Sequence, residues 1–155
     1  MPAQTSSPAL TTVARLLAAH AAVTRELSAE LVAQHGLSLA EYEALLLLSR
    51  EEERRMRRVD LAAQARLSPS GVTRMLDRLE RAGLVEKGAC PEDARVTYAV
   101  LTDAGMARLE RCSRDHFAAA ERVLGERLDT DEQRTLAELL GRLGDADSAD
   151  CGPQA

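Results

Sequence analysis

The feature that most constrains the fold is the stretch SPSGVTRMLDRLERAG, residues 68 to 83. Its first residue, Ser68, is a strong helix cap, and Pro69 follows at the first helical position, where the missing N–H of proline costs no hydrogen bond. At the other end, Gly83 is the kind of residue that terminates a helix. These signals predict a helix from Pro69 to about Ala82.

The segments on either side of this helix complete a compact motif. Before it, Asp60 is expected to open a brief helix over 61 to 66, and residues 67 and 68 form a tight turn, which gives a helix-turn-helix. After it, the pattern changes to two β-type segments, 84 to 87 and 96 to 101, separated by the turn-rich GACPEDA. These two segments predict a β-hairpin, or wing.

Long helices precede the winged core. Apolar residues recur at three- and four-residue steps over 10 to 31, which predicts an amphipathic helix ending near 34 to 36. A second helix starts at Ser38, with Glu41 as its capping-box partner, and stops around Arg50. The charged REEERRMRR that follows is expected to end in a short edge strand.

Two more helices are predicted beyond the wing. Thr102 or Asp103 caps a long helix, and Thr130 with Gln133 forms a capping box that opens a last one. We therefore predict a mainly α-helical protein with a small β-hairpin wing, a winged helix-turn-helix with flanking N- and C-terminal dimerisation helices. The expected boundaries are a flexible arm over 1–8, a single domain over 9–143 with its winged part at 54–101, and a flexible tail over 144–155.

Composition limits the class of protein. With 45% hydrophobic and 29% charged residues, the 155-residue chain resembles a soluble globular domain, and no apolar run reaches membrane-spanning length. The start has no basic residue before an apolar region, so we expect no secretory signal and a cytoplasmic protein. Three cysteines at scattered spacing argue against disulfides and a metal cluster, and we expect neither a metal nor a cofactor.

Charge is unevenly distributed along a chain whose formal net charge is -5. Residues 54 to 95 contain ten basic and six acidic residues, whereas the remainder contains ten basic and nineteen acidic ones. A basic middle between acidic flanks suits a polyanion such as nucleic acid, although a solvated charged face would have the same composition.

The predicted helix from Pro69 has two distinct faces. Its apolar residues, at 3.6-type spacing, must face the core, and the opposite face is polar and cationic. A helix in the major groove of DNA needs short hydrogen-bonding residues near its start and cations that reach phosphates or guanine edges. Any one arginine could instead stay solvated or form an ion pair, for example Arg74 with Asp77 or Asp93. The candidate DNA-binding residues on this helix are Ser68, Ser70, Thr73, Arg74 and Arg78.

The motifs LSPSGVTRMLDRLERAGLV and DARVTYAVLTDAG closely resemble the MarR family of winged helix-turn-helix regulators. The family's wing signature, an Asp, any residue, an Arg, five residues and Leu-Thr, is met by Asp93, Arg95, Leu101 and Thr102. The resemblance implies a homodimer that binds palindromic operators in double-stranded DNA. It also implies that Arg95 enters the minor groove, whose negative potential attracts a guanidinium, and that Asp93 braces the wing turn. Asp93 could equally be an ordinary turn former.

The flanking helices bear more apolar surface than the small winged core can cover. One recognition helix contacts only a few base pairs, so two copies held ~34 Å apart, one DNA turn, are needed. We therefore interpret helices 9 to 35 and 103 to 143 as dimerisation helices, with packing inside one chain as the alternative for any single residue. The candidate interface residues are Leu10, Val13, Leu17, Leu136, Leu139, Leu140 and Leu143.

A small organic effector is a further implication of the resemblance, because many such proteins release DNA when one binds. Such a ligand acts only if it prefers the spacing of the two recognition helices that does not bind DNA. His20 could instead be a core histidine, since it lies on an apolar stripe. The candidate effector-binding residues are His20, Arg25, Tyr42 and Arg66.

Oxidation is the alternative switch. Cys90 falls in the predicted wing near Arg95, where its oxidation could alter DNA contact, and a passive surface thiol is the simpler interpretation. Cys112 and His116 lie one helical turn apart, but two ligands make an incomplete metal site, and Cys112 is expected in the core.

The predicted function is that of a sequence-specific DNA-binding transcription regulator, a homodimeric repressor released by an effector. The alternatives are a redox-responsive regulator using Cys90 and a winged-helix module that contacts only proteins. An enzyme is not expected, because the sequence contains no Gly-rich phosphate loop, no G-x-S-x-G elbow and no complete metal set.

Overall fold

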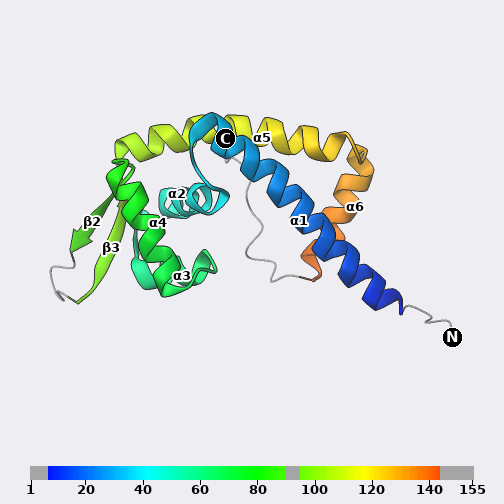
Figure 1. Ribbon diagram of the computed structural model, residues 1–155, viewed down its shortest axis with the longest axis horizontal. Helices are drawn as coiled ribbons and strands as arrows, with labels where there is room; N and C mark the ends of the chain where they lie inside the picture. Colours follow the sequence, from blue (N-terminus) through cyan, green and yellow to red (C-terminus); the bar gives the residue numbers. More distant parts are fainter. Residues whose placement is uncertain (1–6, 90–94, 144–155) are drawn as a thin grey trace. The chain divides into compact units, whose positions relative to one another are not determined.

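The computed structural model describes residues 7–89 and 95–143, in two compact units, Met1–Phe117 and Ala118–Ala155 (Figure 1). Most of the chain is helical and one small antiparallel sheet is present, which confirms the predicted fold class. The expected single domain stays a prediction. No helix of the described ranges has the length and apolar character needed to cross a membrane.

In chain order the elements are α1 (Pro8–His35), α2 (Leu39–Arg50), the 3-10 turn η1 (Glu52–Arg54), β1 (Arg55–Arg57), α3 (Arg58–Gln64), α4 (Pro69–Arg81), β2 (Val85–Ala89), β3 (Thr97–Leu101), α5 (Asp103–Gly125) and α6 (Thr130–Gly141).

The wing belongs to a three-stranded antiparallel sheet in the order β1-β3-β2. β2 and β3 form the predicted hairpin, with Val85 opposite Leu101, and Figure 1 shows this hairpin projecting from the helices of the first unit. β1 pairs with the other edge of β3, where Met56 lies opposite Ala99. β1 is the edge strand expected at the end of the charged segment, so the wing is fastened to the chain between α2 and α3.

Local capping fixes the starts of α2 and α4. Ser38 Oγ accepts from the Glu41 N–H at 3.2 Å, and the Glu41 carboxylate accepts from the Ser38 N–H at 2.8 Å. Ser68 Oγ accepts from the Gly71 N–H at 3.1 Å, and Pro69 is the first residue of α4. Both predicted caps are therefore confirmed.

The start of α6 differs from the prediction by one residue. Asp129, not Thr130, is the cap, and its carboxylate accepts from the N–H groups of Asp131 and Glu132. The Glu132 carboxylate accepts in return from the Asp129 N–H at 2.9 Å, while Gln133 donates from its side chain to a backbone carbonyl. The predicted pair of Thr130 and Gln133 is wrong because a carboxylate binds two amides at once, and charge strengthens both bonds.

α3 begins and ends earlier than predicted. It starts at Arg58, directly after β1, so Asp60 lies within its first turn instead of opening it. The helix ends at Gln64, because Arg66 adopts a left-handed conformation with a φ of 53°. The Leu67 N–H then donates back into the last turn, as in the usual glycine-terminated helix. The sequence has no glycine at this position, so it does not indicate that α3 ends early.

The core of the first unit is built around α4. Leu76 and Leu79 on its apolar face are 0% and 1% exposed, and they cluster with buried residues of α2, α3, the sheet and α5. Each such side chain contributes roughly 1.5–3 kcal/mol by leaving water. Gly105, in the first turn of α5, lies so close to the sheet that a Cβ there would overlap the Leu84 carbonyl oxygen. The core thus fixes α4 firmly and leaves its other face open.

Candidate nucleic-acid interface

The outward face of α4 carries the short polar residues named from the sequence. Ser68, Ser70, Thr73 and Arg74 are all exposed, opposite the buried apolar face. Ser68 Oγ lies 3.3 Å from Ser70 Oγ, and the Thr73 hydroxyl donates to the Pro69 carbonyl at 2.9 Å. These local bonds orient the hydroxyl groups at the start of the helix while leaving them accessible.

Two arginines of α4 have different surroundings. Arg81 donates from Nε to the backbone carbonyl of Asp77 at 3.0 Å. Within residues 7–89 and 95–143, Arg74 makes no hydrogen bond or ion pair through its guanidinium, so the alternative pair with Asp77 is not formed. Asp93, the other alternative partner, lies outside the described residues. Arg74 is therefore an accessible cation on the exposed face of the helix.

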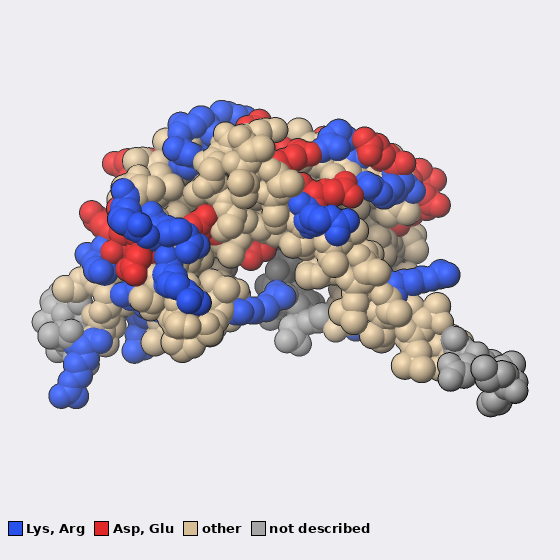
Figure 2. Space-filling view, in the orientation of Figure 1, with Lys and Arg blue, Asp and Glu red and all other residues tan. Residues whose placement is uncertain are grey.

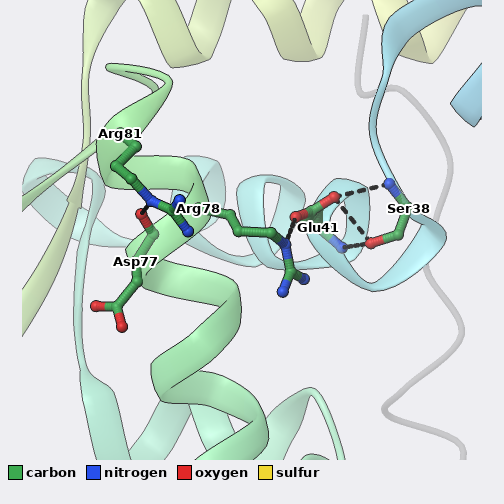
Figure 3. Close-up of polar contacts among 5 residues, drawn as sticks. All are labelled: Ser38, Glu41, Asp77, Arg78 and Arg81. Atoms are coloured by element: carbon green, nitrogen blue, oxygen red, sulfur yellow. Dashed lines mark hydrogen bonds and ion pairs between the residues drawn. The ribbon is translucent and has the colours of Figure 1, made fainter.

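Arg78 has a partner that the sequence did not indicate. Its Nε donates to Oε1 of Glu41 at 2.7 Å; the Arg78 side chain stays half exposed, whereas that of Glu41 is 8% exposed (Figure 3). Oε2 of Glu41 accepts from both the N–H and the hydroxyl of Ser38. One buried carboxylate thus joins the first turn of α2 to the last turn of α4. No local signal reveals this contact, because the two residues lie far apart in the sequence.

The surroundings of Glu41 keep it ionised. Burial by itself raises the pKa of a carboxyl group, because water no longer solvates the anion. The hydrogen bonds from the Ser38 N–H, the Arg78 guanidinium and the Ser38 hydroxyl outweigh burial and hold the pKa of Glu41 below its ordinary value of 4.5. At neutral pH the contact therefore joins an anion and a permanent cation.

The wing places a further arginine at its end. Arg95 is exposed in the segment that joins β2 to β3. Figure 2 shows Lys and Arg side chains gathered over α4 and at the end of the wing, with acidic side chains interleaved on the helix. Asp93 and Cys90 lie outside the described residues, so the bracing role of one and the redox role of the other stay predictions.

Part of the basic charge in the middle of the chain is structural. Arg55 lies over the ring of Tyr98, 4.8 Å from its centroid, and pairs with Glu53 at 3.2 Å. Arg54 pairs with Asp103 at 3.0 Å. These contacts fasten β1 and the turn before it to β3 and α5. The charge count alone therefore overstates the cations that could meet a polyanion.

The four candidate effector residues lie on three different parts of the chain. His20 and Arg25 are exposed on α1, and Arg66 is exposed after α3. Tyr42 is buried on α2, where its hydroxyl lies 3.3 Å from Ser113 Oγ. The interpretation of His20 as a core histidine is wrong, and the effector roles stay predictions.

Cys112 is fully buried in the core, as predicted. Burial raises the pKa of its thiol, which therefore stays protonated and unreactive. The His116 ring lies 4.8 Å from that of Tyr42, and burial lowers the pKa of His116. In the part of the chain that the structure describes, no group of three or more metal-ligating side chains forms.

The apolar residues assigned to dimer contact are exposed in the single chain. Their exposed fractions run from 40% for Leu136 to 70% for Leu143. Large apolar side chains exposed along one helix are typical of surfaces that contact another protein. Dimerisation itself stays a prediction. The full set is Leu10, Val13 and Leu17 on α1 with Leu136, Leu139, Leu140 and Leu143 on or directly after α6.

The two-helix motif, the wing and the open face of α4 define a winged helix-turn-helix protein. Residues 37–97 match the model of the MarR family, a span that runs from the turn before α2 to the start of β3. The family matched is the one whose motifs the sequence resembles.

Curated relatives point to the same family. YdgJ, an uncharacterised HTH-type transcriptional regulator of Bacillus subtilis, is 32% identical over 108 residues, which cover 70% of this chain and 64% of that protein. YetL, an HTH-type transcriptional repressor of the same bacterium, is 32% identical over 111 residues, which cover 72% of this chain and 66% of that protein. The chain thus spans slightly less than two thirds of the length of these relatives.

Solved structures share the fold. Sco3205, a MarR family transcriptional regulator from Streptomyces coelicolor in complex with DNA, has a TM-score of 0.79 and 28% identity, with 90% of this chain and 88% of that chain covered. A mutant MarR from E. coli complexed with operator DNA has a TM-score of 0.74 and 26% identity, with 85% and 93% covered. The chain belongs to the MarR family, which comprises transcription regulators and not enzymes.

Proposed function

We propose that this protein is a homodimeric, sequence-specific DNA-binding regulator that represses transcription from a palindromic operator. The observation that carries the proposal is the division of α4 into two faces. Its apolar residues are at most 4% exposed, whereas Ser70, Thr73 and Arg74 are exposed on the opposite side. A helix held by its own core in this way can enter the major groove and present hydrogen-bonding groups to base edges.

The wing supplies the second contact. Arg95 is exposed between β2 and β3, where a guanidinium can reach the narrow minor groove beside the site of α4. Phosphate contacts by the other exposed cations would fix the register of the protein on the duplex.

Two copies are needed for a specific complex. The exposed leucines of α6 and the apolar residues at the start of α1 support a homodimer, because one helix contacts too few base pairs for useful affinity. A twofold dimer also explains why the operator should be palindromic.

Release by a small organic effector completes the proposal. Its support is the family resemblance, together with Tyr42, whose buried position between α2 and α5 would couple a ligand to the winged core. A ligand would act by favouring a dimer in which the two recognition helices no longer match successive grooves.

The test measures binding to duplex DNA taken from upstream of the protein's own gene. Arg95→Ala should weaken binding on the order of tenfold and lower the salt slope by about one per subunit, because one cation per wing is lost. Fluorescence anisotropy at several salt concentrations gives both quantities. Arg111→Ala removes an exposed arginine from α5 and serves as the control, with an unchanged affinity expected.

Equal affinity of the Arg95→Ala variant and the wild type would contradict the assigned role of the wing. A wild-type protein that binds no duplex even at low ionic strength would instead favour a module that contacts only proteins. Competition with random-sequence DNA separates specific from non-specific binding in the same assay.

A further inference from the structure

The ion pair between Glu41 and Arg78 has a defined geometry that the proposed function does not use. A buried carboxylate is costly to desolvate, and the cost is offset only when its oxygens are bound. Ser38 binds Oε2 twice, and the Arg78 Nε–H binds Oε1. The contact is therefore held in one arrangement, unlike a surface ion pair between two mobile side chains.

Only one of the N–H donors of Arg78 is used by Glu41. The bond comes from Nε, and Figure 3 shows the terminal nitrogens turned away from the carboxylate. The side chain of Arg78 is 52% exposed, so these nitrogens remain accessible. A free arginine loses rotamer entropy when it binds a phosphate, whereas this one is already held at Nε.

We propose that Glu41 is a positioning residue for DNA binding: it holds Arg78 by Nε so that the terminal nitrogens of the guanidinium face a DNA phosphate. The inference rests on the proposed function, since it needs α4 to lie on duplex DNA. Arg78 lies in the last turn of α4, beyond the residues that face the groove, where a recognition helix meets the DNA backbone. The planar fork of arginine matches two phosphate oxygens, and it binds best when its orientation is fixed.

Simple charge arithmetic predicts the opposite effect. Glu41 is an anion beside a helix that approaches a polyanion, so removing its charge should by itself strengthen DNA binding. Loss of orientation should weaken it. Because the two effects have opposite signs, one substitution distinguishes them.

Glu41→Gln separates the two contacts of this side chain. Glutamine is accepted at this position of a capping box, so its amide oxygen can keep the bonds from Ser38. Its NH2 group would then face the Nε–H of Arg78. Because both groups are donors, the hydrogen bond that holds Arg78 is lost. We expect binding to a random-sequence duplex of about 30 base pairs, long enough for two half-sites, to weaken on the order of fivefold at low ionic strength.

Glu80→Gln is the matched charge control. Glu80 is also on α4 and pairs with Lys87 at 3.2 Å, so the variant removes the same charge from the neighbourhood of the same helix without touching Arg78. Its affinity should equal or slightly exceed that of the wild type. The difference between the two Gln variants isolates the orientation of Arg78 from the loss of charge.

A double-mutant cycle tests whether Glu41 acts through Arg78. In an Arg78→Gln background, Glu41→Gln should cause no further loss of affinity, whereas a merely structural role predicts the same loss in both backgrounds. Arg78→Lys keeps the charge but has no separate Nε–H and no planar fork, so Glu41 cannot hold it while two parallel donors face a phosphate, and it should also bind more weakly than the wild type. Thermal unfolding of each variant shows whether the fold is intact, and Arg78→Lys decides the question if Glu41→Gln does not fold.

Three results would overturn the proposal: equal affinities of the Glu41→Gln and Glu80→Gln variants, an undiminished effect in the Arg78→Gln background, or wild-type affinity of Arg78→Lys. A wild-type protein without salt-dependent binding to duplex DNA would overturn the proposed function as well. The two failures are thus distinguishable, since the first leaves wild-type binding intact.

Discussion

α4 and α6 have similar sequence patterns, but the apolar face of one is buried and that of the other is exposed. Each helix begins with a side-chain cap and carries apolar residues at helical spacing. The apolar residues of α4 are at most 4% exposed, whereas the leucines Leu136, Leu139 and Leu140 of α6 are at least 40% exposed. The same sequence pattern therefore describes a helix buried by its own chain and a helix whose apolar face is uncovered in the single chain.

The difference shows what a periodic pattern can establish. Periodicity says that a helix has one apolar face, and it does not say which surface covers that face. For α4 the cover is the winged core. For α6 we propose a second copy of the chain. Substitutions that treat the two helices alike are the direct way to test this difference.

The largest expected effect is that of a charge placed in the apolar face of α4. Leu76 is 0% exposed, so Leu76→Glu buries an unpaired carboxylate at a cost of several kcal/mol, which is comparable with the whole stability of a small domain. We expect a largely unfolded protein, observed as loss of the cooperative transition in circular dichroism. A folded variant with a normal melting curve would contradict the assignment of α4 to the core.

The same substitution in α6 should leave the fold intact. Leu139 is 49% exposed, and Leu139→Glu should keep the helical content while it abolishes the dimer, because the charge would be buried only on association. Analytical ultracentrifugation measures the mass of both proteins. If Leu139→Glu has the same mass as the wild type, the leucines of α6 do not form the dimer contact.

Loss of a cap should have a smaller effect, and a similar one in both helices. Ser68→Ala removes the acceptor of the Gly71 N–H, and Asp129→Ala removes the acceptor of two N–H groups. Each should cost about 1 kcal/mol in urea unfolding. Ser68→Gly is the control, because glycine at a cap costs only a few tenths of a kcal/mol. A loss at Ser68 as large for glycine as for alanine would mean that the hydroxyl acts through something other than the cap.

The smallest expected effect is a pH dependence that belongs to α4 and its partner α2. The folded protein lowers the pKa of Glu41 below its ordinary 4.5, so the resulting stabilisation is complete above pH 4.5 and is lost as the pH falls through the lowered value. Urea unfolding above and below pH 4.5 should show that the free energy of unfolding falls more steeply with decreasing pH for the wild type than for Glu41→Gln. Parallel pH profiles would mean that Glu41 contributes no stability through its charge.

The elements set by local chemistry were predictable. The caps at Ser38 and Ser68 and the buried face of α4 follow from residues within a few positions of one another, and so does the exposure of Thr73 and Arg74. Where two local signals overlap, as at Asp129 and Thr130, the prediction was wrong by one residue, because spacing alone does not rank competing caps.

Features that depend on distant residues were not predictable. The bond between Glu41 and Arg78 and the stacking of Arg55 on Tyr98 join segments that meet only after the chain folds. The left-handed Arg66 is a similar case, since it lies in the turn between α3 and α4 and no glycine in the sequence indicates that conformation.

The third strand of the sheet gives the wing mechanical stiffness. A hairpin attached only through its two ends could bend where it joins the helices, whereas pairing with β1 holds β3 at Val100, Ala99 and Tyr98. A force on the tip of the wing is then transmitted through β1 to the segment between α2 and α3. The tip of the wing is thereby connected to the first helix of the helix-turn-helix, because α3 starts at Arg58, the residue directly after β1.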